Sequence, residues 1–368
     1  MRILHTEWSD GWGGQERRIV SEMAGLAARG HESWLVTRAQ CRIRAEAERR
    51  GIPVITLPLA GRADPRSIFP LARLLRRERI EIVNTHSGVD SWVGGLAARL
   101  ARVPVLLRTR HLNLPLKRNW VNFVHYLPDR VITCGEAMRR QLIEHHGFPS
   151  RQVVSIPTGI DFAAFAPKRT RVETRRALGI ADDAFLILMV GVIRGVKRHA
   201  LAVQALHRLI PQLDRARLVL AGDGPMRPDT ERLARELGMA DKIYFLGQRN
   251  DVADLMGAAD VLLLTSRSEG VPQAVTQALG LGLPVIATAV GGVPELIEHE
   301  RTGLRVPPED VEAIAAALAR VARDPAGASR LSAQGREHVL AHFSLEAMLD
   351  KTEALLTGLL AEKTGNTR

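Results

Sequence analysis

Residues 261–297 read VLLLTSRSEGVPQAVTQALGLGLPVIATAVGGVPELI, and the fold of the whole chain can be interpreted outward from them. The stretch opens with a short apolar run, 261–264, which has the length and character of a buried parallel strand. A polar break, a helical pattern over about 272–281 and a second apolar run at 284–287 follow. This order of strand, loop, helix and strand is one βαβ unit, and it predicts an α/β fold with a parallel sheet.

The two loops of this unit have the chemistry of a ligand site. In open parallel sheets, ligands bind at the carboxyl ends of the strands, where both loops are expected. Glu269 precedes Gly270, Val271 and Pro272, at a helix start whose free N–H groups and positive dipole end face outward. The glycine pair 291–292 precedes another helix start, so the main chain there can approach a phosphate or a sugar closely.

This arrangement resembles the nucleotide-sugar signature of retaining glycosyltransferases of family 4 (group 1), which have the GT-B fold. The signature is a Glu, seven residues and a second Glu, with a Gly-Phe-Pro-like step after the first. Here the first is Glu269, but the second position is occupied by Gln277. In the family the first Glu contacts a donor-sugar hydroxyl and the second binds the ribose. Gln277 can still hydrogen-bond to ribose without the strengthening charge, so we expect weakened or altered nucleotide binding and retained activity. An ordinary βαβ unit with incidental charges is the alternative.

A glycine-rich loop over residues 11–14 follows the first predicted strand and precedes an amphipathic helix predicted over 15–29. Such a loop lets the main chain approach a phosphate, although a plain tight turn explains a glycine pair equally well. The family has a Gly-Gly loop followed by Glu here, matched by Gly13, Gly14 and Glu16. The resemblance implies that Gly13 and Gly14 approach the donor phosphate and that Glu16 lies on the acceptor side.

Buried runs alternate with helical patterns elsewhere in the chain, which predicts doubly wound parallel sheets. A chain of 368 residues is also too long for a single core. The segment 154–161, VSIPTGID, resembles the family's step into its second domain, and a charged linker, 162–176, follows. We predict an acceptor-binding Rossmann-like domain at 1–165 and a nucleotide-sugar-binding one at 166–343, facing a central cleft. By resemblance, a helix at about 344–362 packs back on the first domain.

The start of the predicted second domain carries two cations on one loop. The family has an Arg just after the glycine that ends the first strand of this domain and a Lys six residues after that glycine, and both bind the diphosphate. Lys197 stands six residues after Gly191; the Arg position is Val192, and Arg194 comes two residues later. Two cations at a helix start can hold a diphosphate, so Lys197 and Arg194 are candidate catalytic residues.

Two further loops of this domain are expected to touch the donor. The turn beginning at Gly222 resembles the family's Gly-Asp-Gly-Pro turn. A dinucleotide-binding interpretation is disfavoured, because Arg227 stands where a third glycine would be needed. By resemblance, the loop that contains Gln248 flanks the nucleotide base.

Two histidines stand just past predicted strand ends, His86 in NTHSG and His111 in RTRHLN. A single loop histidine is commonly a solvated or structural residue, but loops after parallel strands form the wall of a ligand cleft. His111 aligns with the family's N-domain histidine, which contacts the donor sugar or assists the reaction. We therefore take His111 and Glu269 as candidate catalytic residues, and His86 as a candidate on the acceptor side.

The formal net charge is +11, and it is confined to the first part of the chain. Residues 1–160 hold 25 Lys and Arg against 14 Asp and Glu, whereas residues 161–368 hold 26 against 26. A one-sided basic domain indicates an anionic partner: nucleic acid, a membrane surface or an acidic acceptor. Basic and aromatic residues in 112–129 and an Arg-rich helix at 67–79 suit a membrane interface, or else a solvated surface. No nucleic-acid-binding motif is present, so no nucleic-acid partner is predicted.

The sequence gives no sign of a metal or of a secreted protein. It has no Asp-x-Asp and no Cys/His cluster with zinc spacing, so we predict no metal and no cofactor. Cys41 and Cys134 have no pairing pattern, which suits a reducing cytoplasm. No apolar run is long enough to span a membrane, and the first residues lack a signal-peptide pattern.

These observations predict a cytoplasmic, metal-independent hexosyltransferase at the inner face of the plasma membrane. By resemblance, it moves a sugar from a nucleotide-sugar donor, most commonly UDP-linked, with retention of anomeric configuration. The acceptor is expected to be an anionic, membrane-associated glycan or lipid-linked sugar, with lipopolysaccharide or another cell-envelope polysaccharide favoured. The alternatives are a GT-B nucleotide-sugar epimerase and a non-catalytic sugar-nucleotide-binding protein.

Overall fold

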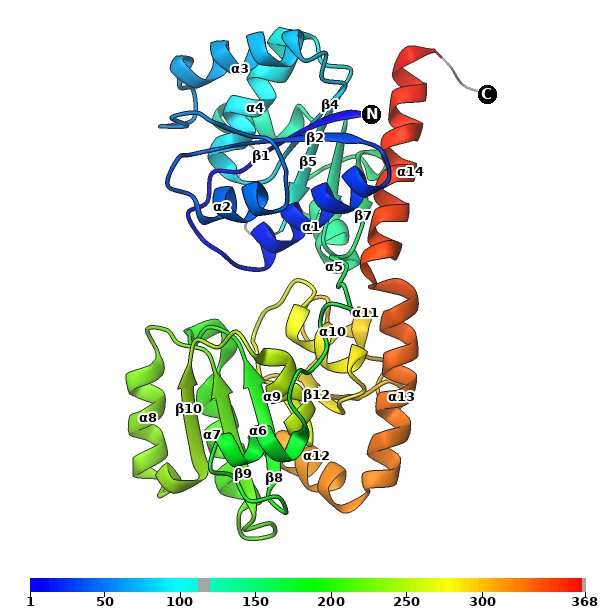
Figure 1. Cartoon of the computed structure of the whole chain (residues 1–368). Helices are drawn as coiled ribbons and strands as arrows, with labels where there is room; N and C mark the ends of the chain where they lie inside the picture. Colours follow the sequence, from blue (N-terminus) through cyan, green and yellow to red (C-terminus); the bar gives the residue numbers. More distant parts are fainter. Residues whose placement is uncertain (112–119, 366–368) are drawn as a thin grey trace. The chain divides into compact units, whose positions relative to one another are not determined.

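A computed structural model describes residues 1–111 and 120–365 (Figure 1). Part of the basic and aromatic segment singled out in the sequence, 112–119, lies outside the described residues. The chain divides into two compact units. Unit 1 consists of Met1–Gly159 and Leu345–Arg368, and unit 2 consists of Ile160–Ser344.

Unit 1 is built on a seven-stranded parallel sheet with the order β3-β2-β1-β4-β5-β6-β7. Its strands are β1 Arg2–Thr6, β2 Glu32–Thr37, β3 Val54–Thr56, β4 Ile82–Thr85, β5 Val105–Arg110, β6 Arg130–Thr133 and β7 Val153–Ser155. Neighbouring residues of one strand contribute to different cores: Ile3 of β1 joins one apolar cluster and Leu4 joins another. Both faces of the sheet are therefore covered, as expected of a parallel sheet with crossover helices.

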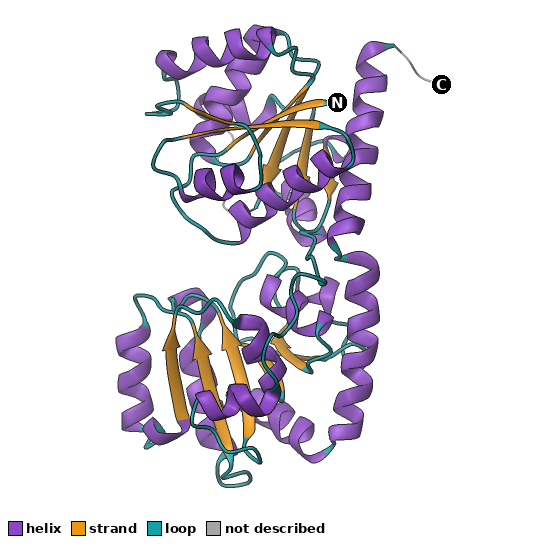
Figure 2. Ribbon diagram, viewed as in Figure 1, coloured by secondary structure: helices purple, strands orange, loops and turns teal. Residues whose placement is uncertain are grey.

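Helices connect these strands and cover the sheet (Figure 2). They are α1 Gly14–Ala28, α2 Arg42–Arg49, α3 Pro65–Arg77, α4 Gly88–Ala101, α5 Glu136–Glu144 and, from the end of the chain, α14 Leu345–Thr364, with short 3-10 helices η1 Trp120–Tyr126 and η2 Ser150–Gln152. Helix α14 lies against α1 at a glycine: a Cβ atom on Gly25 would stand 2.4 Å from Leu349 Cδ1. Met348 and Leu356 of α14 join the apolar cluster that contains Ile3.

Unit 2 contains a six-stranded parallel sheet with the order β10-β9-β8-β11-β12-β13. Its strands are β8 Phe185–Val190, β9 Ala216–Ala221, β10 Ile243–Gly247, β11 Val261–Leu264, β12 Val285–Thr288 and β13 Leu304–Val306. Its helices are α6 Arg171–Ala177, η3 Gly195–Lys197, α7 His199–Leu209, α8 Arg227–Glu236, η4 Ala240–Lys242, α9 Val252–Ala258, α10 Gln273–Gly280, α11 Val293–Leu296, α12 Val311–Arg323 and α13 Pro325–His342. Ile187 and Leu188 of β8 enter separate apolar clusters, so this sheet is also covered on both faces.

The sequence-based prediction of doubly wound parallel sheets is confirmed, and the quoted stretch forms β11, α10, β12 and α11 in the predicted order. The predicted division fell at residue 165, whereas unit 2 begins at Ile160. Phe162, which the sequence placed in a linker, packs on α10: a Cβ atom on Gly280 would stand 2.0 Å from its Cε1. This contact attaches the start of the linker to unit 2.

Candidate functional site

Lys197 and Glu269 form an ion pair at the carboxyl ends of two neighbouring strands of unit 2. Lys197 ends η3, in the connection that follows β8, and Glu269 lies in the loop after β11. Because β8 and β11 are paired, their following loops meet. Lys197 Nζ is 2.6 Å from Glu269 Oε1, and the side chains are 17% and 11% exposed. The structure thus brings together two residues that the sequence predicted for opposite ends of an activated sugar.

The two loops are also held together by bonds that do not involve this ion pair. Thr265 Oγ1 donates to the main-chain oxygens of Lys197 and Arg198, each at 3.0 Å. The main-chain N–H of Arg267 donates to the carbonyl oxygen of Val196 at 2.8 Å. The loops should therefore keep their arrangement when either charge of the pair is removed.

The loop after β12 approaches the Glu269 loop so closely that only glycine fits. A Cβ atom on Gly291 would stand 1.8 Å from the carbonyl oxygen of Glu269, and Gly291 has a φ of +54°. The neighbouring Gly292 donates its N–H to the carbonyl oxygen of Gly270 at 2.7 Å. The glycine pair thus supports the Glu269 loop through main-chain contacts.

Gly222 makes a similar approach on the other side of β8. A Cβ atom there would stand 1.9 Å from the carbonyl oxygen of Gly191, at the start of the loop that carries Lys197. Gly222 therefore supports the Lys197 loop. Its predicted contact with the donor stays a prediction.

The other predicted donor residues lie in loops and helices that follow strands of the same sheet. Arg194 is exposed and precedes η3, and among the described residues its side chain has no hydrogen-bond or ion-pair partner. Gln277 is half-buried within α10, one turn after the helix start at Pro272. Val271 is half-buried beside Pro272, and Gln248 is exposed just after β10. Their predicted contacts with a donor remain predictions.

Sequence reasoning missed one residue of this site. The Oγ of Ser266 donates to Glu269 Oε1 at 2.5 Å, so that oxygen is bound by both a hydroxyl and an ammonium group. Ser266 is fully buried, and its carbonyl oxygen accepts a hydrogen bond from Thr288 Oγ1 at 2.6 Å. Ser266 could have been found from its position, because it lies two residues past the end of β11 in a polar loop.

In unit 1 the predicted glycine loop does begin a helix. Gly13 is the N-cap of α1, and Gly14 is its first residue. The N–H of Gly13 donates to Glu16 Oε2 at 2.8 Å, and Glu16 is only 5% exposed. Glu16 therefore caps its own helix, which is a structural role that the acceptor-side prediction did not anticipate.

Glu7, which the sequence did not single out, is a buried carboxyl group at the end of β1. It accepts hydrogen bonds from the main-chain N–H groups of Trp8 and Ser9, at 2.8 and 2.7 Å, and from Gln15 Nε2 at 2.5 Å. Burial, followed by the charge of Asp90, raises the pKa of Glu7 to about 8. Glu7 thereby ties the glycine loop to the end of the strand.

His86 and His111, the two predicted histidines, are in contact. His86 Nδ1 lies 3.0 Å from His111 Nε2, because their strands β4 and β5 are neighbours. His86 is 4% exposed, and its main-chain N–H donates to the buried Asp90 at 2.8 Å. Burial lowers the pKa of both histidines well below the usual range, which keeps their rings neutral near pH 7.

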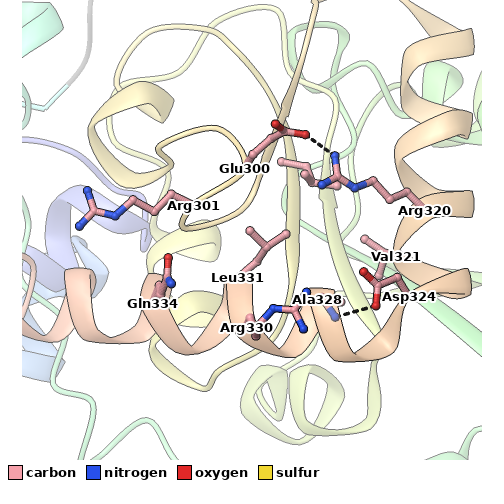
Figure 3. A pocket seen from close by; sticks show the side chains of 11 residues that line it. Glu300, Arg301, Arg320, Val321, Asp324, Ala328, Arg330, Leu331 and Gln334 are labelled. Atoms are coloured by element: carbon pink, nitrogen blue, oxygen red, sulfur yellow. Dashed lines mark hydrogen bonds and ion pairs between the residues drawn. The ribbon is translucent and has the colours of Figure 1, made fainter.

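Unit 2 also has a charged hollow away from the Lys197–Glu269 pair, and we do not take it as a candidate site (Figure 3). It is lined by residues of α12 and α13, by Leu304 of β13, and by Glu300 and Arg301 in the turn that precedes β13. The Lys197–Glu269 pair lies at the opposite ends of the strands. Several charges of the hollow already have partners within the protein, since Glu300 pairs with Arg320 and Arg301 pairs with Glu298.

Within residues 1–111 and 120–365, the structure contains no group of three or more His, Cys, Asp or Glu side chains placed to hold a metal ion. Among the same described residues, no helix combines the length and the apolar character needed to cross a membrane.

Comparisons with known proteins match both units. The family model described as "Glycosyltransferase Family 4" matches residues 12–164, and the model described as "Glycosyl transferases group 1" matches residues 170–338.

Similar curated proteins extend over most of the chain. A UDP-Gal:alpha-D-GlcNAc-diphosphoundecaprenol alpha-1,3-galactosyltransferase of Escherichia coli is 26% identical over 326 residues, covering 85% of this chain and 84% of that protein. A D-inositol 3-phosphate glycosyltransferase of Kribbella flavida is 30% identical over 308 residues, covering 74% of this chain and 72% of that protein.

Among solved structures, Anabaena HepE in complex with UDP superposes with a TM-score of 0.85 at 20% identity, over 97% of this chain and all of that chain. This likeness shows the fold.

Proposed function

This chain belongs to the group 1, family 4 glycosyltransferases and has the GT-B fold, and we propose that it is a retaining hexosyltransferase that uses a UDP-sugar donor and a membrane-associated acceptor. Transfer of a sugar from a nucleotide-sugar donor follows from the family. The choice of uridine is supported by the E. coli relative, whose name specifies UDP-Gal, and by the Anabaena neighbour, which holds UDP.

The observation that carries the proposal is the Lys197–Glu269 ion pair at the carboxyl ends of β8 and β11. Sugar transfer breaks the bond between the anomeric carbon and the diphosphate, and negative charge develops on the leaving oxygen. Lys197, together with the exposed Arg194 three residues before it, is suited to stabilise that charge. Glu269 is then released to accept hydrogen bonds from sugar hydroxyls.

The proposed reaction needs no side-chain base, because the leaving diphosphate can take the acceptor proton. The acceptor hydroxyl oxygen bonds to the anomeric carbon, the carbon–oxygen bond to the diphosphate breaks, and the acceptor proton passes to the leaving diphosphate. The two basic residues would do the work that a metal ion does in other diphosphate-releasing enzymes, and so we propose that transfer is independent of metal. Gln277 would accept or donate hydrogen bonds at the ribose, and Gln248 would lie beside the base.

For the acceptor, we propose a lipid-linked or otherwise membrane-associated cell-envelope glycan such as lipopolysaccharide, bound by unit 1 at the cytoplasmic membrane surface. The name of the E. coli relative specifies a sugar on diphosphoundecaprenol. In unit 1, Phe69 of α3 is 64% exposed, and arginines at 66, 73, 76 and 77 lie on the same helix. An exposed aromatic ring among arginines suits an interface with anionic lipid.

The proposal is tested by incubating the purified chain with a UDP-sugar and a lipid-diphosphate-linked sugar acceptor and following transfer. The same donor without acceptor is the control for epimerisation, since an isomerised sugar there would point to the other reaction type. Metal independence predicts unchanged rates in excess EDTA.

The proposed membrane association is tested separately. The chain should float with vesicles of anionic lipid more than with vesicles of neutral lipid, and Phe69→Asp should reduce flotation while leaving UDP binding unchanged. Equal flotation with both kinds of vesicle would remove the membrane part of the proposal.

A further inference from the structure

A row of buried side chains lies behind His111. His5 Nδ1 is 3.0 Å from His86 Nε2, and His86 Nδ1 is 3.0 Å from His111 Nε2. At the far end, His111 Nδ1 is 3.6 Å from Cys134 Sγ. His5 and Cys134 are 1% and 6% exposed. Both ring nitrogens of His111 are therefore engaged within the protein.

The row restricts where the protons of the three imidazoles lie. Burial lowers the pKa of His5 to about 3 and also lowers the pKa values of His86 and His111, so all three rings are neutral at pH 7. A neutral imidazole has one N–H and one lone pair. Two successive N–H···N bonds consequently require all three rings to carry the proton on the same nitrogen, either Nδ1 or Nε2.

Cys134 decides between these two arrangements. Arg18 Nη1 donates to Cys134 Sγ at 3.3 Å, and Sγ in turn donates to the carbonyl oxygen of Arg110 at 3.3 Å. A guanidinium group has no acceptor, a carbonyl oxygen has no donor, and a thiol has a single proton. Once that proton points to Arg110, the sulfur can only accept from His111, so His111 carries its proton on Nδ1.

Arg18 is itself held in place, which makes this arrangement specific. It also donates to the carbonyl oxygen of Ile156 at 2.7 Å and to Thr158 Oγ1 at 3.2 Å, and it is 1% exposed. In the resulting row, His5 donates to His86, His86 donates to His111, and His111 donates to Cys134. Among the described residues, His5 Nε2 has no hydrogen-bond partner. In this direction of donation His5 carries its proton on Nδ1, so the unpartnered Nε2 bears a lone pair and no N–H is left without an acceptor.

We propose that His86, backed by His5, is a positioning residue that holds the imidazole of His111 in the Nδ1–H tautomer. The proposal rests on the proposed function and on the expectation, implied by the family resemblance, that His111 contacts the donor sugar or assists the reaction. Its consequence for mechanism is specific: no ring nitrogen of His111 is available as a base. His111 then contributes to the reaction by contact and not by proton transfer, and His86 acts through it.

The first test needs no variant and no substrate. In the 15N-histidine-labelled full chain, the NMR signals of His111, assigned by their absence in His111→Asn, should show a protonated Nδ1 and an unprotonated Nε2 from pH 6 to pH 8. A protonated Nε2, or a change of state within this range, would overturn the proposal. UDP binding by the same sample, measured by calorimetry, tests the proposed function separately.

The second test is a matched pair at His86. The amide nitrogen of Asn takes the place of Nδ1 and can still donate to His111, whereas that of Gln takes the place of Nε2 and faces His5. His86→Asn should keep the His111 tautomer and a kcat within about 3-fold of the parent. His86→Gln should give mixed tautomers and a kcat lower by roughly 10-fold, with the donor KM within about 2-fold. Equal kinetic losses in both variants with an unchanged His111 tautomer would show a merely structural role.

Discussion

Lys197 and Glu269 are 72 positions apart in sequence, and yet the ammonium nitrogen of one lies 2.6 Å from a carboxylate oxygen of the other. The two opposite charges offset each other in this ion pair. A nucleotide diphosphate brings negative charge that competes for Lys197, and a sugar brings hydroxyl groups that Glu269 can accept. We therefore propose that donor binding exchanges this ion pair for two new sets of contacts.

Replacing Glu269 by Gln should remove transfer without unfolding the chain. We expect kcat/KM to fall on the order of 100-fold, because the amide accepts sugar hydrogen bonds more weakly than the carboxylate. The melting temperature should change little, since Thr265 and Arg267 hold the loops independently. Steady-state transfer kinetics and a thermal melt check both points. Glu298→Gln, at an exposed carboxylate of the same unit, is the control and should transfer normally; full transfer by Glu269→Gln would refute the role.

Gln277→Glu restores the charge that the family has at this position. We expect UDP to bind more tightly or with similar affinity, because ribose hydroxyls donate more strongly to a carboxylate than to an amide. Calorimetric titration with UDP measures the change. Gln334→Glu, on the exposed side of α13 at the hollow in Figure 3, should leave the affinity as it was. Binding weakened about tenfold by Gln277→Glu alone would place Gln277 away from the ribose.

Gly291→Ala tests how closely the loop after β12 approaches the loop of Glu269. The new Cβ atom would stand 1.8 Å from a main-chain oxygen at a φ of +54°, so the loops must separate. We expect a loss of about 2 kcal/mol or more in unfolding free energy, together with weaker donor binding. Gly282→Ala is the control. Gly282 has a φ of +75°, and the nearest atom to a Cβ there is Arg336 Cδ at 3.9 Å, so this variant measures the cost of the backbone conformation alone. Equal losses of stability in both variants would mean that the close approach is unimportant.

The raised pKa of Glu7 predicts a pH dependence of stability. The pKa of Glu7 is about 8 in the folded chain against an ordinary value of 4.5, so as the pH rises the unfolded state ionises first. The stabilising contribution of Glu7 is present in full below pH 4.5 and is lost as the pH rises towards 8. Glu7→Gln removes this dependence, so the stability of the variant relative to the parent should rise between pH 5 and pH 8 in chemical denaturation. A constant difference across that range would contradict the raised pKa.

Much of the candidate donor site could be predicted from sequence because its residues follow apolar runs that are easily recognised as buried strands. Lys197 and Glu269 each lie a few residues past such a run, and the parallel pairing of β8 with β11 brings them together. The alternation of strands and helices also predicted both sheets.

The other contacts described above could not be predicted, because they depend on which strands are neighbours and leave no local pattern in the sequence. His5 meets His86 only because β1 pairs with β4, although two strands intervene in sequence. Nothing local distinguishes the buried Glu7 from an exposed carboxylate, or shows that Glu16 bonds back to its own helix start. Phe162 looked like part of a linker because the helix that it contacts lies far along the chain.

Calorimetric titration of Lys197→Met with UDP tests the central claim most directly. Methionine keeps most of the length of the side chain and removes only its charge, so a lost contact with the diphosphate should weaken UDP binding by about 10- to 100-fold. Lys168→Met, which removes an exposed lysine of the same unit, should bind UDP like the parent. An unchanged dissociation constant for Lys197→Met, in a chain whose parent binds UDP, would contradict the account.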